Sequence, residues 1–137
     1  MRIAIVYDSR TGTTRAAAEE MTQMAVAAGH ECAAVAVQAS NPSDVAAADA
    51  VCVGSWTEGY FFFGQHATKA TMEFIDQLEL ASTPTAVFCT YKTSPGKMLN
   101  KMADRLETRG AKVTGRFRSR GRAAPDGFGN WLESLKA

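Results

Sequence analysis

Short hydroxyl side chains are concentrated near the amino end of this sequence. Residues 8–14 read Asp-Ser-Arg-Thr-Gly-Thr-Thr, and the hydroxyls belong to Ser9, Thr11, Thr13 and Thr14. A single capping residue is enough to begin a helix, so four hydroxyls in six residues exceed that need. Hydroxyls and the free N–H groups of a helix start both donate hydrogen bonds to phosphate oxygens. The segment therefore predicts a phosphate site, in which Arg10 either neutralises charge or faces water.

Two aromatic residues stand just after apolar runs. Trp56 follows Gly54 and Ser55 and precedes Thr57, and Tyr91 follows Thr90. Flat aromatic side chains stack on planar ligands. For Trp56 the alternative is that the ring simply covers the end of a strand.

The elements that must position these residues alternate regularly along the chain. Apolar runs predict strands at 3–7, 32–37, 50–54, 85–89 and 112–119. Helical patterns lie between them at 13–28, after the turn 41–44, at 66–79, and from Pro95 to Gly110, and a last helix has an apolar face at Phe128, Trp131, Leu132 and Leu135. Strict β–α alternation predicts an α/β fold with a doubly wound, five-stranded parallel sheet in the order 2-1-3-4-5. The fifth strand alternates polar and apolar residues, which is typical of an edge strand.

In such sheets ligands bind beyond the carboxyl ends of the strands, where the strand order reverses. Here that point lies between the first and third strands. The loops 8–14, 54–64 and 90–94 are expected to meet there. The hydroxyl segment and both aromatic residues then belong to one site.

Ser9-Arg10-Thr11-Gly12-Thr13-Thr14, directly after the first strand, resembles the flavodoxin phosphate loop, [S/T]-x-T-G-x-T. The resemblance implies a flavodoxin-like three-layer sandwich that binds flavin mononucleotide (FMN), with Trp56 and Tyr91 against the flavin ring. It implies cofactor-binding roles for Ser9, Arg10, Thr11, Gly12, Thr13, Thr14, Ser55, Trp56, Thr57, Thr90 and Tyr91. The loop before Tyr91 is shorter than flavodoxins usually have, and Thr57 stands where many have glycine.

Length and cysteine content set further limits. A chain of 137 residues is expected to form a single domain, residues 1–137. No apolar run reaches the roughly 18 residues of a membrane span, and a first strand starting at Arg2 leaves no room for a signal peptide. Cys32, Cys52 and Cys89 are widely spaced, which favours buried, reduced thiols in a cytoplasmic protein over a disulfide framework or a metal site.

Several other classes of protein with a doubly wound sheet have characteristic motifs that this sequence lacks. It has neither the P-loop G-x4-G-K-[S/T] nor a nicotinamide-binding G-x-G-x-x-G. No cysteine follows the first strand, as a low-molecular-weight phosphatase requires, and Asp8 stands without the second acid of a response-regulator receiver. No acid, base and nucleophile form an evident catalytic group.

Charge is unevenly distributed. Residues 31–91 hold seven acids and one base, whereas residues 92–122 hold ten bases and two acids. Flavodoxins are usually acidic, so this basic segment predicts a redox partner protein that is itself acidic and docks near the flavin edge. The alternative is an ordinary solvated surface. We expect no nucleic acid as a partner.

The leading functional hypothesis is electron transfer through bound FMN, in which the protein supplies the pocket and the flavin does the chemistry. The alternative is an FMN-dependent oxidoreductase of a small molecule, of the quinone reductase or porphyrinogen oxidase type. A third hypothesis is a flavin-free interaction domain. The aromatic stretch Tyr60-Phe61-Phe62-Phe63 is compatible with packing, a lid, a partner patch or a dimer contact.

Overall fold

The computed structural model describes residues 1–60, 63–92 and 95–135. A parallel sheet of five strands has the order β2-β1-β3-β6-β7. In chain order these strands are β1 (Arg2–Asp8), β2 (Glu31–Ala36), β3 (Ala50–Trp56), β6 (Pro84–Thr90) and β7 (Lys112–Ser119). The predicted doubly wound order 2-1-3-4-5 is confirmed. The central strands β3 and β6 are buried almost throughout, whereas the edge strands alternate.

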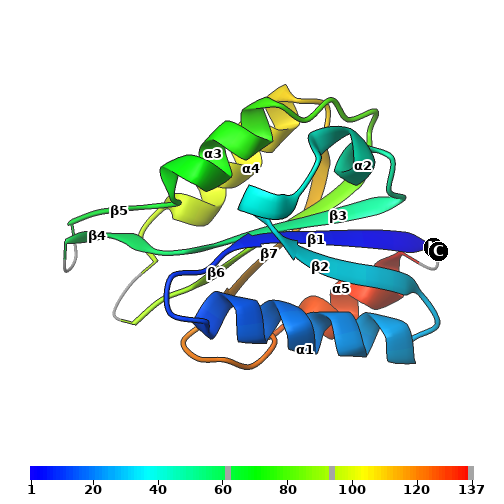
Figure 1. The fold of residues 1–137 in the computed structure, drawn as a ribbon, viewed down its shortest axis with the longest axis horizontal. Coiled ribbons are helices and arrows are strands. Elements are labelled where there is room, and N and C mark those ends of the chain that lie inside the picture. Colours follow the sequence, from blue (N-terminus) through cyan, green and yellow to red (C-terminus); the bar gives the residue numbers. More distant parts are fainter. Residues whose placement is uncertain (61–62, 93–94, 136–137) are drawn as a thin grey trace.

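Helices cover both faces of this sheet and produce three layers (Figure 1). On one face lie α1 (Thr13–Ala27) and α5 (Phe128–Ser134). On the other lie the short turn η1 (Val37–Ala39), α2 (Pro42–Ala46), α3 (Lys69–Asp76) and α4 (Met98–Thr108). Each face buries its own apolar cluster against the sheet.

The predicted apolar face of the last helix is confirmed. Phe128, Trp131 and Leu132 are buried in α5. The rings of Phe128 and Trp131 are stacked at a centroid distance of 5.9 Å, and Phe117 of β7 meets both edge-on. Aromatic packing of this kind fixes α5 on the edge strand.

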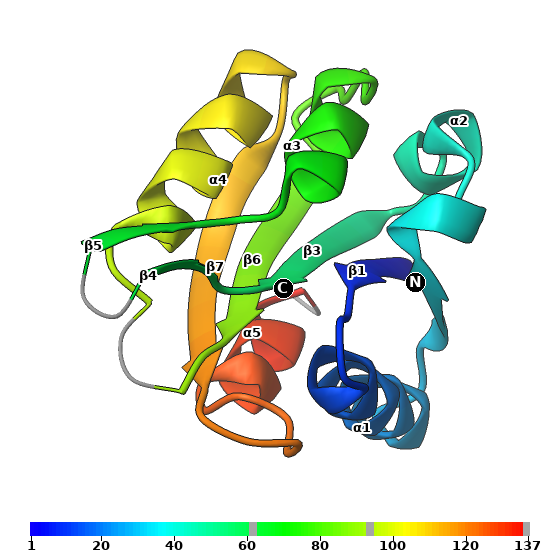
Figure 2. The same cartoon turned by 60° about the vertical axis from the view of Figure 1, so that its left-hand side comes forward.

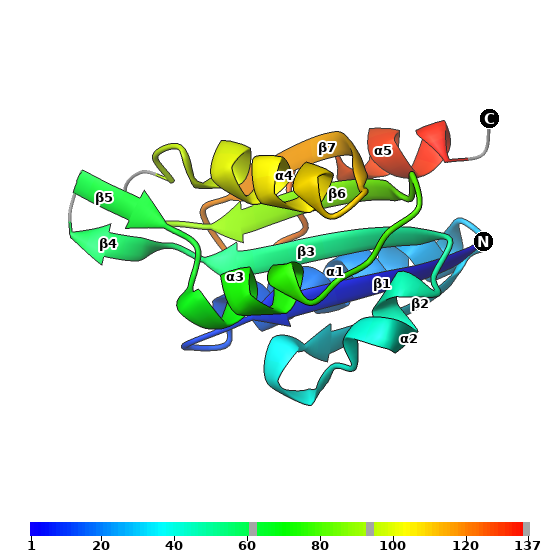
Figure 3. The same cartoon turned by 90° about the horizontal axis from the view of Figure 1, so that it is seen from above.

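The predicted loop 54–64 is wrong in part. Strand β3 continues to Trp56, because the fully buried Ser55 has hydrogen-bond partners and can lie inside a strand. Beyond it, β4 (Glu58–Tyr60) and β5 (Phe63–His66) form an antiparallel hairpin that projects past the sheet (Figures 2 and 3). The expectations for the side chains of Tyr60-Phe61-Phe62-Phe63 lie outside the described residues.

Two predicted helix boundaries also differ. Helix α4 begins at Met98 rather than Pro95, because Gly96 has a left-handed backbone with φ of 59° and interrupts the helical path. The helix expected at 66–79 is α3, Lys69–Asp76, capped by the hydroxyl of Thr68, which accepts from the N–H of Thr71.

The cysteines are free thiols. Cys52 and Cys89 are buried as predicted, but Cys32 is only half-buried because it lies on the edge strand β2. Burial raises the pKa of Cys89 to about 12 and raises that of Cys52 as well. The described residues contain no cluster of three potential metal ligands. Among them, no helix has both the length and the apolar character needed to cross a membrane.

Candidate functional site

The hydroxyl segment forms a tight loop between β1 and α1. Gly12 has a φ of 89°, a left-handed conformation that glycine adopts without strain. The Ser9 hydroxyl oxygen accepts hydrogen bonds from the N–H groups of Gly12 at 3.1 Å and Arg15 at 3.2 Å. Beside it, the hydroxyls of Thr11 and Thr13 lie 3.4 Å apart. Ser9 thus shapes the loop, and the two threonines present a pair of neighbouring hydroxyls.

Three further threonine contacts bring the predicted loops together. The hydroxyls of Thr14 and Thr90 form a buried hydrogen bond at 2.7 Å. Thr57 donates to the carbonyl oxygen of Thr90 from its N–H at 3.1 Å and from its hydroxyl at 2.9 Å. The start of α1 and the ends of β3 and β6 are therefore joined at Thr90, as the fold position of these residues predicts.

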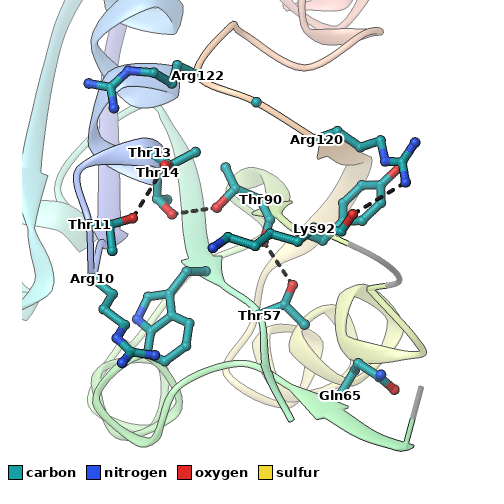
Figure 4. Close-up of a pocket in the computed structure, with 13 residues that line it drawn as sticks. Arg10, Thr11, Thr13, Thr14, Thr57, Gln65, Thr90, Lys92, Arg120 and Arg122 are labelled. Carbon is teal, nitrogen blue, oxygen red and sulfur yellow. Dashed lines mark hydrogen bonds between the residues drawn. The ribbon is translucent and has the colours of Figure 1, made fainter. Parts of the chain in front are cut away.

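An arginine guanidinium group lies over the ring of each of the two predicted aromatic residues. Arg10 lies over Trp56, 5.4 Å from the ring centroid, and Arg120 lies over Tyr91 at 5.9 Å. Arg120 also donates to the carbonyl oxygen of Lys92 at 3.3 Å (Figure 4). Cations at such distances interact favourably with the ring face. Arg10 is thus engaged at the aromatic end of the site.

These residues surround an open pocket of about 570 Å³ at the carboxyl ends of the strands. Its lining comprises Arg10, Thr11, Thr13, Thr14, Trp56, Thr57, Gln65, Thr90, Tyr91, Lys92, Arg120, Gly121 and Arg122 (Figure 4). Most of the predicted site residues are therefore brought together. Ser9, Gly12 and Ser55 are not among the lining residues.

A buried polar network explains the place of Ser55. Its hydroxyl donates to the carbonyl oxygen of Trp56 and accepts from the N–H of Thr68 at the start of α3. The hydroxyl of Thr68 in turn donates to the carboxylate of Asp8, which also accepts from Gln38 at 3.0 Å. Buried polar groups with such partners rigidify their surroundings. Ser55 and Asp8 thus hold the ends of β3 and β1 in position beneath the pocket.

Sequence reasoning did not name Gln65, Lys92, Arg120, Gly121 or Arg122 as site residues, although Lys92 lies in the loop 90–94 that was expected to reach the site. The uneven charge of residues 92–122 was visible in the sequence, but nothing local indicated that the chain after β7 returns to the pocket. The described pocket lining contains four cationic side chains and no acidic one. Such a lining creates a positive potential that attracts anions.

The pocket thus offers hydroxyl donors, flat aromatic rings and positive charge. Comparison with the family models decides which group of proteins this is. The model described as a flavodoxin domain matches residues 4–132. The chain belongs to the flavodoxin family.

Solved structures share this fold. The flavodoxin of Megasphaera elsdenii, in its two-electron reduced form, is 27% identical, with a TM-score of 0.81 over 98% of this chain and 99% of that one. A Streptococcus pneumoniae flavodoxin is 19% identical, with a TM-score of 0.77 over 98% of this chain and 94% of that one. The Synechocystis Flv1 flavodiiron core is 18% identical, with a TM-score of 0.75 over 99% of this chain and 36% of that one. The sequence matches no curated protein.

Flavodoxins are FMN-binding flavoproteins that transfer electrons to partner proteins. The residues of this pocket fit that cofactor chemically. A phosphate needs several donors and tolerates nearby cations, and a flavin ring needs flat apolar surface. The hydroxyls and the four cations of the lining meet the needs of the phosphate, and the two aromatic side chains meet that of the ring.

Proposed function

We propose that this flavodoxin binds FMN in the pocket described above and carries electrons through it. The phosphate binds to the loop from Ser9 to Thr14, and the flavin ring lies against Trp56 and Tyr91. Ser55, Thr57 and Thr90 support the ring side of the site. FMN supplies the redox chemistry, and the protein residues bind and orient it.

This proposal rests on one observation. Hydroxyl groups suited to a phosphate and aromatic rings suited to a flavin line the same pocket. Thr11 and Thr13 lie at the start of α1, where backbone N–H groups and the helix dipole favour an anion. Trp56 and Tyr91 line the same pocket from the ends of β3 and β6. A ligand with a phosphate at one end and a flat ring at the other meets both requirements.

Comparing FMN with riboflavin tests the phosphate loop, because the two differ only by the phosphate. We expect the double variant Thr11→Val, Thr13→Val to bind FMN far more weakly, with little change for riboflavin. Hydrogen bonds to a charged group contribute about 1.5–3 kcal/mol each. Titration followed by flavin fluorescence measures both dissociation constants.

The matched control is Thr108→Val, the same chemical change on the exposed end of α4. It should leave both affinities unchanged. Equal losses for FMN and riboflavin in the double variant would show that this loop does not hold the phosphate.

We propose further that the redox partner is an acidic protein that docks beside the pocket. A second groove is lined in part by Lys97, Arg116 and Arg118. Arg116 and Arg118 are exposed on the edge strand β7, which leads toward Arg120. On the side of α4, Arg116 donates to Asn100 at 2.8 Å and lies 3.9 Å from Glu107. These exposed basic side chains are complementary to an acidic surface.

Electron-transfer rates test the partner's charge. The reduced holoprotein should reduce an acidic redox protein at a rate that falls steeply as salt rises from 50 to 500 mM, because added ions screen attraction beyond about 10 Å. Arg116→Glu with Arg118→Glu should slow that reaction at low salt. Basic cytochrome c serves as the control and should show the opposite salt dependence. A rate independent of ionic strength would refute the docking proposal, and the basic residues would then form an ordinary solvated surface.

A further inference from the structure

A fourth segment of the chain reaches the pocket besides the three predicted loops. After β7 the chain turns back toward the start of α1 (Figure 1). The Ser119 hydroxyl lies 3.2 Å from the carbonyl oxygen of Gly121 and 3.1 Å from that of Ala123, and the carbonyl oxygen of Ser119 accepts from the N–H of Tyr91 at 3.0 Å. These contacts make residues 119–123 a defined turn that is tied to the aromatic end of the site.

The two arginines of this turn lie at different ends of the pocket (Figure 4). Arg120 covers the ring of Tyr91. Arg122 lies beside the hydroxyl loop, where its Nη2 is 4.0 Å from the position that a Cβ would take on Gly12. One short turn thus supplies a cation to the ring side and another to the phosphate loop.

The guanidinium of Arg122 has no other evident role. In the described part of the chain it makes no hydrogen bond and no ion pair, whereas Arg10 lies over Trp56 and Arg120 over Tyr91. The pocket lining in the described residues also contains no carboxylate that could neutralise it. A side chain with a permanent charge and five donors is suited to phosphate oxygens.

We propose that Arg122 is a phosphate ligand of this flavodoxin, so that charge as well as hydroxyl donors selects FMN over its unphosphorylated form. The inference rests on the proposed phosphate loop and adds a ligand from a fourth segment. Its consequence is that FMN affinity depends on ionic strength. Riboflavin affinity does not, since riboflavin carries no charge for Arg122 to attract.

The test compares FMN and riboflavin affinities of the 137-residue chain at 50 and 500 mM salt. Arg122→Gln keeps a polar side chain but removes the charge. We expect it to weaken FMN binding tenfold or more at low salt, to change riboflavin binding less than twofold, and to reduce the salt dependence for FMN. Arg122→Lys should recover part of the loss.

The control is Lys112→Gln, which removes the same charge from an exposed residue at the opposite end of β7. With a rise of 3.3 Å per residue, that position is roughly 20 Å or more from the pocket. It should leave both affinities unchanged. Arg122 is itself exposed, and its variants should keep the far-ultraviolet circular dichroism of the wild type.

Equal weakening of FMN and riboflavin by Arg122→Gln would overturn the inference, as would an effect on FMN no larger than that of Lys112→Gln. The valine variants of Thr11 and Thr13 separate this failure from that of the phosphate loop. If they abolish the preference for FMN while Arg122→Gln retains it, only the role of Arg122 fails. A wild-type protein with no preference for FMN would refute the loop itself.

Discussion

Replacing either Thr14 or Thr90 by valine should destabilise the fold, although both residues line the pocket. Their hydroxyl oxygens lie 2.7 Å apart, and the two residues are only 1% and 4% exposed. Valine has nearly the same shape as threonine but lacks the hydroxyl, so each single variant leaves the remaining hydroxyl buried without this partner. An unsatisfied buried polar group costs about 1–3 kcal/mol, which is the expected loss for each variant.

The double variant Thr14→Val, Thr90→Val should lose much less than the sum of the single losses. Removing both hydroxyls leaves no unpaired group, and replacing both partners by apolar groups of the same shape is nearly neutral. Urea unfolding of the flavin-free protein, followed by circular dichroism, measures all four free energies of unfolding. The double-mutant cycle then isolates the coupling between the two residues, which we expect to be about 1–3 kcal/mol.

Additive losses in the cycle would refute the reasoning, because they would mean that the two hydroxyls do not depend on each other. Wild-type stability in both single variants would do so as well. Flavin titration of the same proteins separates stability from binding. If FMN affinity fell strongly while the stability losses were additive, Thr14 and Thr90 would act as cofactor ligands. Their hydroxyls would then not stabilise each other.

Three other outcomes are expected. FMN should quench the emission of Trp56, measured in a Trp131→Phe variant that has no second tryptophan; unchanged emission would contradict stacking. Gly54→Ala should lower the thermal unfolding midpoint, because the new Cβ would lie 2.1 Å from the Cζ of the fully buried Phe88. Overpacking of this kind costs about 1–3 kcal/mol or more. An unchanged midpoint would show that the Phe88 ring can move to make room. The thiol of Cys89, with its pKa raised to about 12, should react with a disulfide reagent at pH 8 only after unfolding, so prompt labelling of Cys89 in the native protein would be inconsistent with its burial.

The sheet could be predicted because its signals are local. Each apolar run is short and bounded by turn or helix signals, and strict alternation leaves few topologies. The hydroxyl loop and the two aromatic residues were found for the same reason, since each stands directly after a strand. Where a polar residue interrupted the pattern, as Ser55 does in β3, the prediction ended the strand too early. A buried hydroxyl satisfied by Thr68 is a tertiary contact that no local pattern indicates.

The contribution of residues 119–123 could not be predicted for a related reason. Their charge was evident from composition, but their position depends on β7 being the edge strand and on the chain returning across the sheet end to α1. Arg122 and Gly12 are far apart in sequence and become neighbours only in the fold. From the sequence, the basic segment was therefore interpreted as a docking surface or a solvated surface, and the structure adds that Arg122 of this segment lies beside Gly12.

The backbone at Thr57 is restricted both by the type of residue and by its hydrogen bonds. A threonine disfavours positive φ because it is β-branched, and among the described residues other than glycine only Ser82 has a positive φ. The structure adds that the N–H and the hydroxyl of Thr57 both donate to the carbonyl oxygen of Thr90. A rearrangement that moved this N–H and hydroxyl away from Thr90 would break both hydrogen bonds. A glycine in its place would lose the side-chain contact and the restriction together, so Thr57 makes this part of the pocket lining more rigid than a glycine would.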